Sequence, residues 1–236
     1  MRRVSLKTLM VAVAGICIPL AWLGGKVTEG KKEQEAARIL EGLLAVVDFD
    51  YEVDEGGGLT GANPPQSQWL RNVFGDFAFQ DVVAVKFVSK SPVTNADLSI
   101  LSDLPALRDL TLADCEITDA GLSQVGRLKS LQVLSVRRCQ VSDRGLPHLR
   151  LLHNLLVLEL DSTSITDQGL IHLTNLRKLR SLSMTCTQLT DSCIPEIAQL
   201  SELRFLDVRR TGITRGGIKR LRTSLPRCHI LADLFQ

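Results

Sequence analysis

The sequence is poor in aromatic residues and carries almost no net charge. Of its 236 residues only 4% are aromatic, with a single tyrosine, and the formal net charge is +2. Surfaces that bind single-stranded nucleic acid combine a basic groove with aromatic side chains on which bases stack. This composition therefore predicts no nucleic-acid partner.

The usual short motifs of catalysis are also missing. The chain contains no C-x-x-C pair, no H-E-x-x-H, no phosphate-binding loop with a G-K-S/T ending, and no G-x-S-x-G. Each of these motifs places metal ligands, a phosphate cradle or a nucleophile at a fixed spacing. We therefore expect a protein that is not an enzyme, with no cofactor, no metal ion and no small-molecule substrate.

Seven apolar positions recur every 24 residues in the second half of the chain. The set returns at Leu131, Leu155, Leu179 and Leu203, and Ser224 is the one position of 35 that is not apolar. A degenerate earlier copy begins at Val82. The first full copy consists of Leu107, Leu110, Leu112, Ile117, Leu122, Val125 and Leu128.

Each copy reads L-x-x-L-x-L-x-x-C/T-x-I/L/V followed by T/S-D-x-G-L. This pattern resembles the leucine-rich repeat, in which a short strand and a helix must stack on neighbouring units to bury their apolar faces. The resemblance implies an α/β solenoid, a horseshoe with a parallel β-sheet on the concave face and helices on the convex face. We expect it to occupy residues 82–236, including a C-terminal cap that begins near Leu225.

The x-L-x-L-x stretch of each repeat alternates, so every second side chain points outward from the sheet. The outward positions form three columns across the repeats, and they describe the surface on which a protein partner would bind. An apolar residue ringed by charges is typical of a contact anchor; the alternative is an ordinary solvated face. The candidate protein-binding residues are Val133, Arg137, Val157, Glu159, Asp161, Phe205, Asp207 and Arg209.

The T/S-D-x-G-L segment predicts the start of the helix in each repeat. Thr118 is an expected N-cap, and Asp119 in the first turn suits the positive end of the helix dipole. Glycines recur in one column two residues after this aspartate, where the absence of a side chain lets the helix start lie close to the neighbouring coil. Cys193 is the exception in that column, whose glycines are Gly121, Gly145, Gly169 and Gly217.

The chain begins with a basic leader, residues 1–8, and an uncharged apolar run, residues 9–25. As a helix this run is about 25 Å long, close to a hydrocarbon core of about 30 Å. It predicts a single transmembrane anchor; a cleaved signal peptide is the alternative, although no small-x-small site follows Leu23. Positive charges flank both ends, and the short leader favours a C-terminal domain on the exported side of the membrane.

Residues 26–81 are expected to link the anchor to the repeats. Helical spacing over 29–47 predicts a juxtamembrane helix, and strict alternation from Val47 to Asp54 predicts a strand that caps the first open edge of the sheet. The order of anchor, charged helix, V-D-F-D-Y-E and T-D-x-G-L repeats resembles bacterial single-anchor leucine-rich-repeat proteins. The repeats are also similar to the cysteine-containing subtype of F-box proteins, but no F-box candidate precedes them.

The cysteines and histidines do not have the spacing of a metal site. Cys115 and Cys139 occupy a repeat column that continues as threonine, so we expect packing thiols, with a disulfide between them as the alternative. His148 and His172 are one repeat apart and lack further ligands. Taken together, the sequence predicts a membrane-tethered, noncatalytic protein-binding module; the alternative is a structural part of an envelope assembly that packs through its caps or convex face.

Overall fold

A computed structural model describes residues 20–43, 45–49, 51–53, 59–61, 81–87 and 89–233. The chain divides into two compact units, one of residues 1–35 and 50–81, the other of residues 36–49 and 82–236. Of the anchor predicted at 9–25, residues 9–19 lie outside the described part, and residues 20–25 open helix α2 (Leu20–Gly42). None of the described helices has the length and apolar character needed to cross a membrane.

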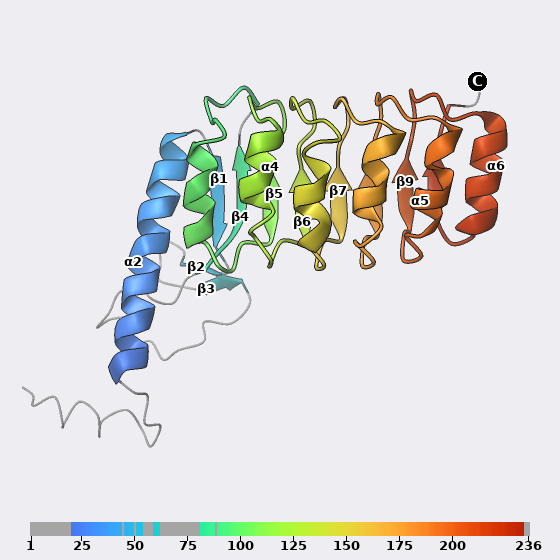
Figure 1. Ribbon diagram of the computed structural model, residues 1–236. Coiled ribbons are helices and arrows are strands. Elements are labelled where there is room, and N and C mark those ends of the chain that lie inside the picture. The colour runs from blue at the N-terminus through green and yellow to red at the C-terminus, as the bar shows by residue number, and fades with distance from the viewer. Residues whose placement is uncertain are drawn as a thin grey trace, which may run out of the picture. The chain divides into compact units, whose positions relative to one another are not determined.

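The second unit contains an eight-stranded sheet in the order β1-β4-β5-β6-β7-β8-β9-β10, with helices covering one of its faces (Figure 1). From β4 to β10 all neighbours are parallel. Residues of β4 pair with those 25 positions along, and from β5 onward each residue pairs with the one 24 positions along, as Leu110 does with Leu134. The predicted parallel sheet is confirmed. Its strands are β1 (Ala45–Phe49), β4 (Val82–Phe87), β5 (Asp109–Thr111), β6 (Val133–Ser135), β7 (Val157–Glu159), β8 (Ser181–Ser183), β9 (Phe205–Asp207) and β10 (His229–Leu231).

The segment before the repeats differs from the prediction at two places. Helix α2 ends at Gly42, so the helix predicted to reach residue 47 stops early, because glycine is a weak helix former and the β-branched Val46 and Val47 favour a strand. The single strand predicted from Val47 to Asp54 is divided. Strand β1 pairs antiparallel with β4, whereas β2 (Tyr51–Val53) pairs with β3 (Leu59–Gly61) in a separate sheet.

The helical side of the sheet is built from short segments. Three are α-helices, α4 (Asp119–Val125), α5 (Ile194–Ala198) and α6 (Arg215–Ser224). The helix expected in each repeat is present, but four of the segments are 3-10 helices. These are η2 (Asp97–Asp103), η3 (Leu146–Leu151), η4 (Asp167–Leu173) and η5 (Asp191–Cys193).

The core runs without a break along the second unit. The inward strand residues Leu110, Leu134, Leu158, Leu182 and Leu206 are fully buried, and they contact the apolar side of the helices. Ala36, Ala37 and Leu40, in the last turns of α2, belong to the same cluster. Each Å² of apolar surface that is buried stabilises the fold by roughly 25 cal/mol. The sum over all repeats stabilises units that cannot fold singly.

Aspartates at the helix starts join each repeat to the next. Thr118 does cap α4, since its hydroxyl accepts from the Ala120 amide. Asp119, however, accepts from both the amide and the hydroxyl of Ser142 in the following repeat, at 2.8 and 2.6 Å. The same contacts recur from Asp143, Asp167 and Asp191 to Thr166, Thr190 and Thr214. We call this set of contacts the aspartate ladder.

The turns after β5, β6, β7, β8 and β9 each hold a non-glycine residue in the left-handed region. The φ angles of these residues lie between 54° and 59°, and their amides donate to a carbonyl of the following repeat. At the last turn no further repeat follows within the described residues, and the amide of Arg210 donates to the carboxylate of Asp233 instead. The residues in this column are Asp114, Arg138, Ser162, Cys186 and Arg210.

Candidate protein-binding surface

The outward residues of β5 to β9 form the face of the sheet opposite the helices, which we call the sheet face. Its first column pairs Val133 with Val157 and Ser181 with Phe205 across adjacent strands. All four side chains are half-buried. Phe205 was predicted to be an exposed contact anchor, but its ring stacks on His229 of β10, with centroids 6.1 Å apart. The final strand, which the sequence shows only as a fragment of a repeat, supplies this cover.

A buried carboxylate organises the centre of the sheet face. Asp161 is 5% exposed and accepts hydrogen bonds from the Ser183 hydroxyl, the Thr185 hydroxyl and the Thr185 amide at 2.5 to 2.8 Å. The guanidinium of Arg137 lies 3.2 Å from the same carboxylate and 4.0 Å from Glu159. A buried carboxylate with this many donors is stable only in one arrangement. Asp161 therefore fixes the position of Arg137.

A second arginine is fixed in the same way on β9. Asp207 is buried, and its two oxygens accept from Nε and Nη2 of Arg209 at 2.9 and 2.6 Å. Hydrogen bonding to Asp207 raises the pKa of the Arg209 guanidinium above its usual value, and the negative charge of Asp207 adds to the effect. The side chain of Arg209 is itself 53% exposed. The outer edge of a permanently charged, oriented guanidinium is thus presented to solvent.

Four arginines from two distant repeats surround one hollow of about 380 Å³ at the carboxyl ends of the strands. Arg137 and Arg209 belong to the third outward column, which is the outward position two residues after the end of each strand. Arg138 and Arg210 belong to the left-handed turns that follow. Two doublets of arginine, 72 residues apart, are the sequence signal for this cluster. The remaining lining residues, Asp161, Ser162, Thr185, Cys186 and Asp233, include three that the outward columns did not predict.

The eight predicted site residues are thus divided by the structure. Arg137, Asp161 and Arg209 meet at the hollow. Glu159 and Asp207 lie in the second column beside it and pair with two of its arginines. Val133, Val157 and Phe205 lie at the beginnings of their strands and do not line the hollow.

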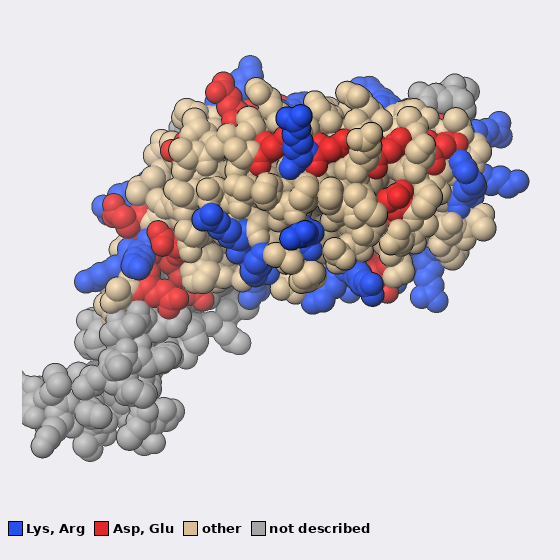
Figure 2. Space-filling view, viewed as in Figure 1, with Lys and Arg blue, Asp and Glu red and all other residues tan. Residues whose placement is uncertain are grey.

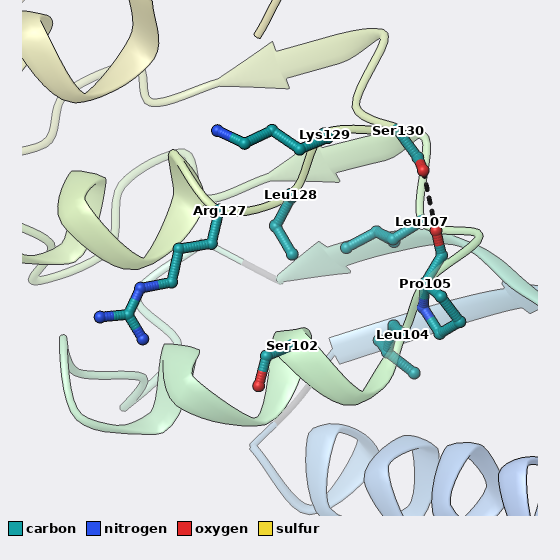
Figure 3. A pocket seen from close by; sticks show the side chains of 8 residues that line it. All are labelled: Ser102, Leu104, Pro105, Leu107, Arg127, Leu128, Lys129 and Ser130. Carbon is teal, nitrogen blue, oxygen red and sulfur yellow. Dashed lines mark hydrogen bonds between the residues drawn. The ribbon is translucent and has the colours of Figure 1, made fainter. Parts of the chain in front are cut away.

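Two further depressions lie on the helical side. The one in Figure 3, about 240 Å³, is lined by Leu104, Leu107 and Leu128 with polar residues at its rim. The Ser130 hydroxyl donates to the Pro105 carbonyl at 2.8 Å, while the side chains of Arg127 and Lys129 extend away from the leucines (Figure 3). Lys129 donates to the carbonyl of Gly126 at the end of α4. These contacts close a turn and present no converging polar groups.

The other depression, about 540 Å³, lies between α5 and α6 and is largely apolar. On the same side of the unit, acidic side chains form a row across the repeats and basic side chains gather near the opposite ends of the helices (Figure 2). Large exposed apolar side chains occur here as well, at Leu151 with 49% and Ile171 with 52% exposure. In the part of the chain that the structure describes, the other two are Ile39 and Val46, beside the first edge of the sheet.

The thiols of the repeat column act as hydrogen-bonding groups. Cys139 donates to the carbonyl of Leu112 at 3.0 Å. At the equivalent position, the hydroxyls of Thr163 and Thr187 each donate at 2.6 Å to the carbonyl three residues earlier in the chain. Cys115 and Cys139 are both free, so the alternative of a disulfide between them is wrong. Burial raises the pKa of the Cys115 thiol to about 11. Packing thiols, as predicted, account for this column.

Neither histidine belongs to a ligand cluster. His148 is exposed and His172 half-buried on the helical side. In the parts of the chain that the structure describes, no group of three or more histidine, cysteine, aspartate or glutamate side chains could hold a metal ion. The acidic residues at 48, 50, 52 and 54 lie outside those whose side chains are described.

Comparison with known proteins gives one family and several similar folds. A family model described as a leucine-rich repeat region matches residues 74–235. An internalin from Listeria monocytogenes is 28% identical, with a TM-score of 0.50 over 58% of this chain and 38% of that chain. The chain thus corresponds to less than half of that internalin. No curated protein sequence matches.

Two other solved structures are similar over a larger share of their own length. Internalin C2 from Listeria monocytogenes is 25% identical, with a TM-score of 0.48 over 57% of this chain and 55% of that chain. The leucine-rich-repeat ectodomain of a receptor kinase from Arabidopsis thaliana is 17% identical, with a TM-score of 0.49 over 86% of this chain and 96% of that chain.

Proposed function

The chain belongs to the leucine-rich-repeat family, and from this premise we propose that it is a membrane-tethered, noncatalytic protein-binding module that recognises its partner on the sheet face. Leucine-rich repeats generally act in protein–protein binding. Fold membership alone does not identify a function, which depends on the site. The single observation that carries the proposal is the pair of buried carboxylates, Asp161 and Asp207, that hold exposed arginines in position on that face.

The cost of burying these carboxylates supports a binding role. A charge removed from water is expensive unless it is fully paired, and apolar residues of similar size would stabilise the sheet as well or better. Asp161 and Asp207 are nonetheless 5% and 4% exposed. Their effect is to orient Arg137 and Arg209 toward solvent, which lowers the entropy lost when a partner binds.

Tethering is proposed from the sequence of residues 1–25. The basic leader and the uncharged run at 9–25 have the order and length of a signal anchor. The similarity to bacterial single-anchor proteins with T-D-x-G-L repeats supports the same arrangement, with the repeats on the exported side. Deletion of residues 1–25 is expected to move the protein from the membrane fraction to the supernatant. If it stays with the membrane, residues 9–25 are not the anchor.

Partner recognition is tested by proximity labelling in the native cell with a tag at the carboxy terminus. Val157 and Ser181 are cross-strand neighbours on the sheet face, so the double variant Val157→Lys, Ser181→Asp changes the surface while the new charges pair and the net charge is kept. Loss of a defined labelled protein is the expected result. The fold of the variant is checked by its thermal unfolding midpoint.

The helical face is the second candidate, because Leu151 and Ile171 are the most exposed large apolar residues among those described in the repeats. Exposed apolar groups on that side favour packing within an envelope assembly. The matched variant Leu151→Lys, Ile171→Asp tests it in the same labelling experiment. If this variant alone loses labelled neighbours, assembly replaces recognition by the sheet face; if neither variant loses any, both proposals fail.

A further inference from the structure

We propose that the hollow between the two arginine doublets binds an extended acidic segment of the partner protein. The inference rests on the proposed function and specifies the chemistry of the partner. Arg137, Arg138, Arg209 and Arg210 are the four cationic side chains of the hollow, and all are exposed. Guanidinium groups bind carboxylates through two parallel hydrogen bonds, which is why arginine is the usual residue for recognising acidic groups.

The two carboxylates that lie beneath these arginines do not occupy the outer surface. The side chain of Asp161 is 7% exposed against 47% for Arg137, and that of Asp207 is 6% exposed against 53% for Arg209. All of the contacts to Asp161 described above come from its own sheet. In these two pairs the positive charge therefore lies on the outward surface, while the compensating negative charge is buried behind it.

The two turn residues, Arg138 and Arg210, add positive charge that is less completely paired with carboxylates. Arg138 is 63% exposed and lies 3.3 Å from Asp114. Among the described residues Arg210 forms no ion pair, and its Nη1 lies 3.9 Å from the sulfur of Cys186. Both residues adopt left-handed backbone conformations that arginine does not favour, with φ near 55°. The left-handed turn directs both side chains to the same rim of the hollow.

The spacing of the doublets fits an extended segment that crosses the strands. Arg137 and Arg209 follow β6 and β9, which are three strand intervals apart, or about 14 Å. Carboxylates four residues apart on one face of an extended chain are separated by about 13 Å. The floor between the doublets is polar and small, formed by Ser162, Thr185 and Cys186. A strand with acidic residues at alternate positions can therefore reach both doublets at once.

One acidic side chain opposes such a ligand. Asp233 lines the hollow, is exposed, and accepts the amide of Arg210. Asparagine can accept the same bond through its amide oxygen without the charge. The variant Asp233→Asn is therefore expected to bind an acidic ligand more tightly than the unchanged protein.

The test uses the full chain in detergent and a fluorescein-labelled decapeptide of alternating aspartate and threonine, with Kd measured by fluorescence anisotropy. The double variant Arg138→Gln, Arg210→Gln is chosen because these arginines do not hold the buried carboxylates. We expect its Kd to rise at least tenfold, about 1.4 kcal/mol. The matched variant Arg150→Gln, Arg177→Gln removes the same charge from the exposed helical side and is expected to leave Kd unchanged.

The position of binding is read from cysteine alkylation. Cys186 is exposed at the floor of the hollow, whereas Cys228 lies outside it, before β10. Saturating peptide is expected to slow alkylation of Cys186 and leave the rate at Cys228 unchanged, as measured by peptide mass spectrometry. An unchanged rate at Cys186, equal losses in the two arginine variants, or equal binding of a peptide with five contiguous aspartates would overturn the proposal.

The two proposals fail in different ways. If the Val157→Lys, Ser181→Asp variant loses a labelled partner but the unchanged protein does not bind the acidic peptide, the sheet face binds a partner of other chemistry. If the peptide binds at Cys186 but no partner is lost in cells, the hollow has the proposed chemistry and the cellular role is wrong.

Discussion

The carboxylate of Asp143 accepts two hydrogen bonds from Thr166 in the next repeat, from its amide at 2.9 Å and from its hydroxyl at 2.6 Å. The amide is one of the donors that a helix start leaves without an intrahelical partner. In each step of the aspartate ladder, an aspartate of the preceding repeat therefore accepts the hydrogen bonds that the helix start of the next repeat needs to make. This couples neighbouring repeats through polar contacts as well as through the core.

Removal of one step is expected to destabilise the second unit. The substitution Asp143→Ala leaves the Thr166 amide and hydroxyl without their acceptor, at a cost of about 1–3 kcal/mol. Asp143→Asn is the control, because Asn95 occupies the equivalent position of the first repeat and makes both contacts to Thr118, accepting from its amide and donating to its hydroxyl. Urea unfolding measures both. Equal losses for alanine and asparagine would show that the charge, not the hydrogen bonds, stabilises the step.

Adjacent glycines in α6 are expected to respond in opposite directions to alanine. A Cβ at Gly217 would lie 2.1 Å from Oδ1 of Asp191, so Gly217→Ala forces this step of the ladder apart and is expected to cost about 1–3 kcal/mol. At Gly216 the nearest atom is 3.5 Å away, and alanine is expected to stabilise the helix by about 0.5–1 kcal/mol. Thermal unfolding of the two variants tests this. A stabilising Gly217→Ala would contradict the close approach.

The 24-residue register explains why so much of the fold could be predicted. Apolar residues at fixed positions define the strands, and their pairing in steps of one repeat follows directly, as for Leu134 and Leu158. The contacts of the aspartate ladder could not be predicted from this register. Asp119 at a helix start has a sufficient local explanation in the helix dipole, and only the geometry between repeats reveals that it bonds to Ser142.

The site was less predictable for a similar reason. The outward columns identified Arg137 and Arg209, but alternation along a strand does not apply to the turn that follows it. Asp233 and Cys186 reach the hollow because of the left-handed turns and the end of the last strand. The partial cover of Phe205 could not be predicted, because it depends on His229, which lies in a strand that matches only half of the repeat pattern.

The last step of the ladder is expected to make stability depend on acid pH. The amide of Thr214 lowers the pKa of Asp191 below its ordinary value of 3.8, and the Thr214 hydroxyl and Arg220 act in the same direction. A lowered pKa in the folded state means that this contribution is complete above pH 3.8 and is lost as pH falls through the folded value. The urea concentration at the midpoint of unfolding should therefore decrease as the pH is lowered from 5 to about 2.5.

The comparison that isolates this group is Asp191→Asn, which keeps an acceptor for Thr214 but cannot titrate. Its urea midpoint is expected to change less than that of the unchanged protein over the same pH range. Asp103→Asn, at an exposed aspartate at the end of η2, serves as the control and is expected to keep the full dependence. The prediction fails if Asp191→Asn and Asp103→Asn give the same slope.

Glycine in the left-handed column is expected to stabilise the repeats. Ser162 has φ of 54°, a conformation that costs an L-residue roughly 1–2 kcal/mol, while its amide is held by the Thr185 carbonyl at 2.8 Å. Ser162→Gly removes that strain, but glycine also raises the conformational entropy of the unfolded chain. The free energy of unfolding is therefore expected to increase by only about 0.5 kcal/mol. Ser164, two residues on, is equally exposed but lies in an extended bridge with Ser142, so Ser164→Gly is expected to lose about 0.5–1 kcal/mol. Urea unfolding distinguishes the two signs, and a loss at both positions would show that the turn after β7 is not strained by its side chain.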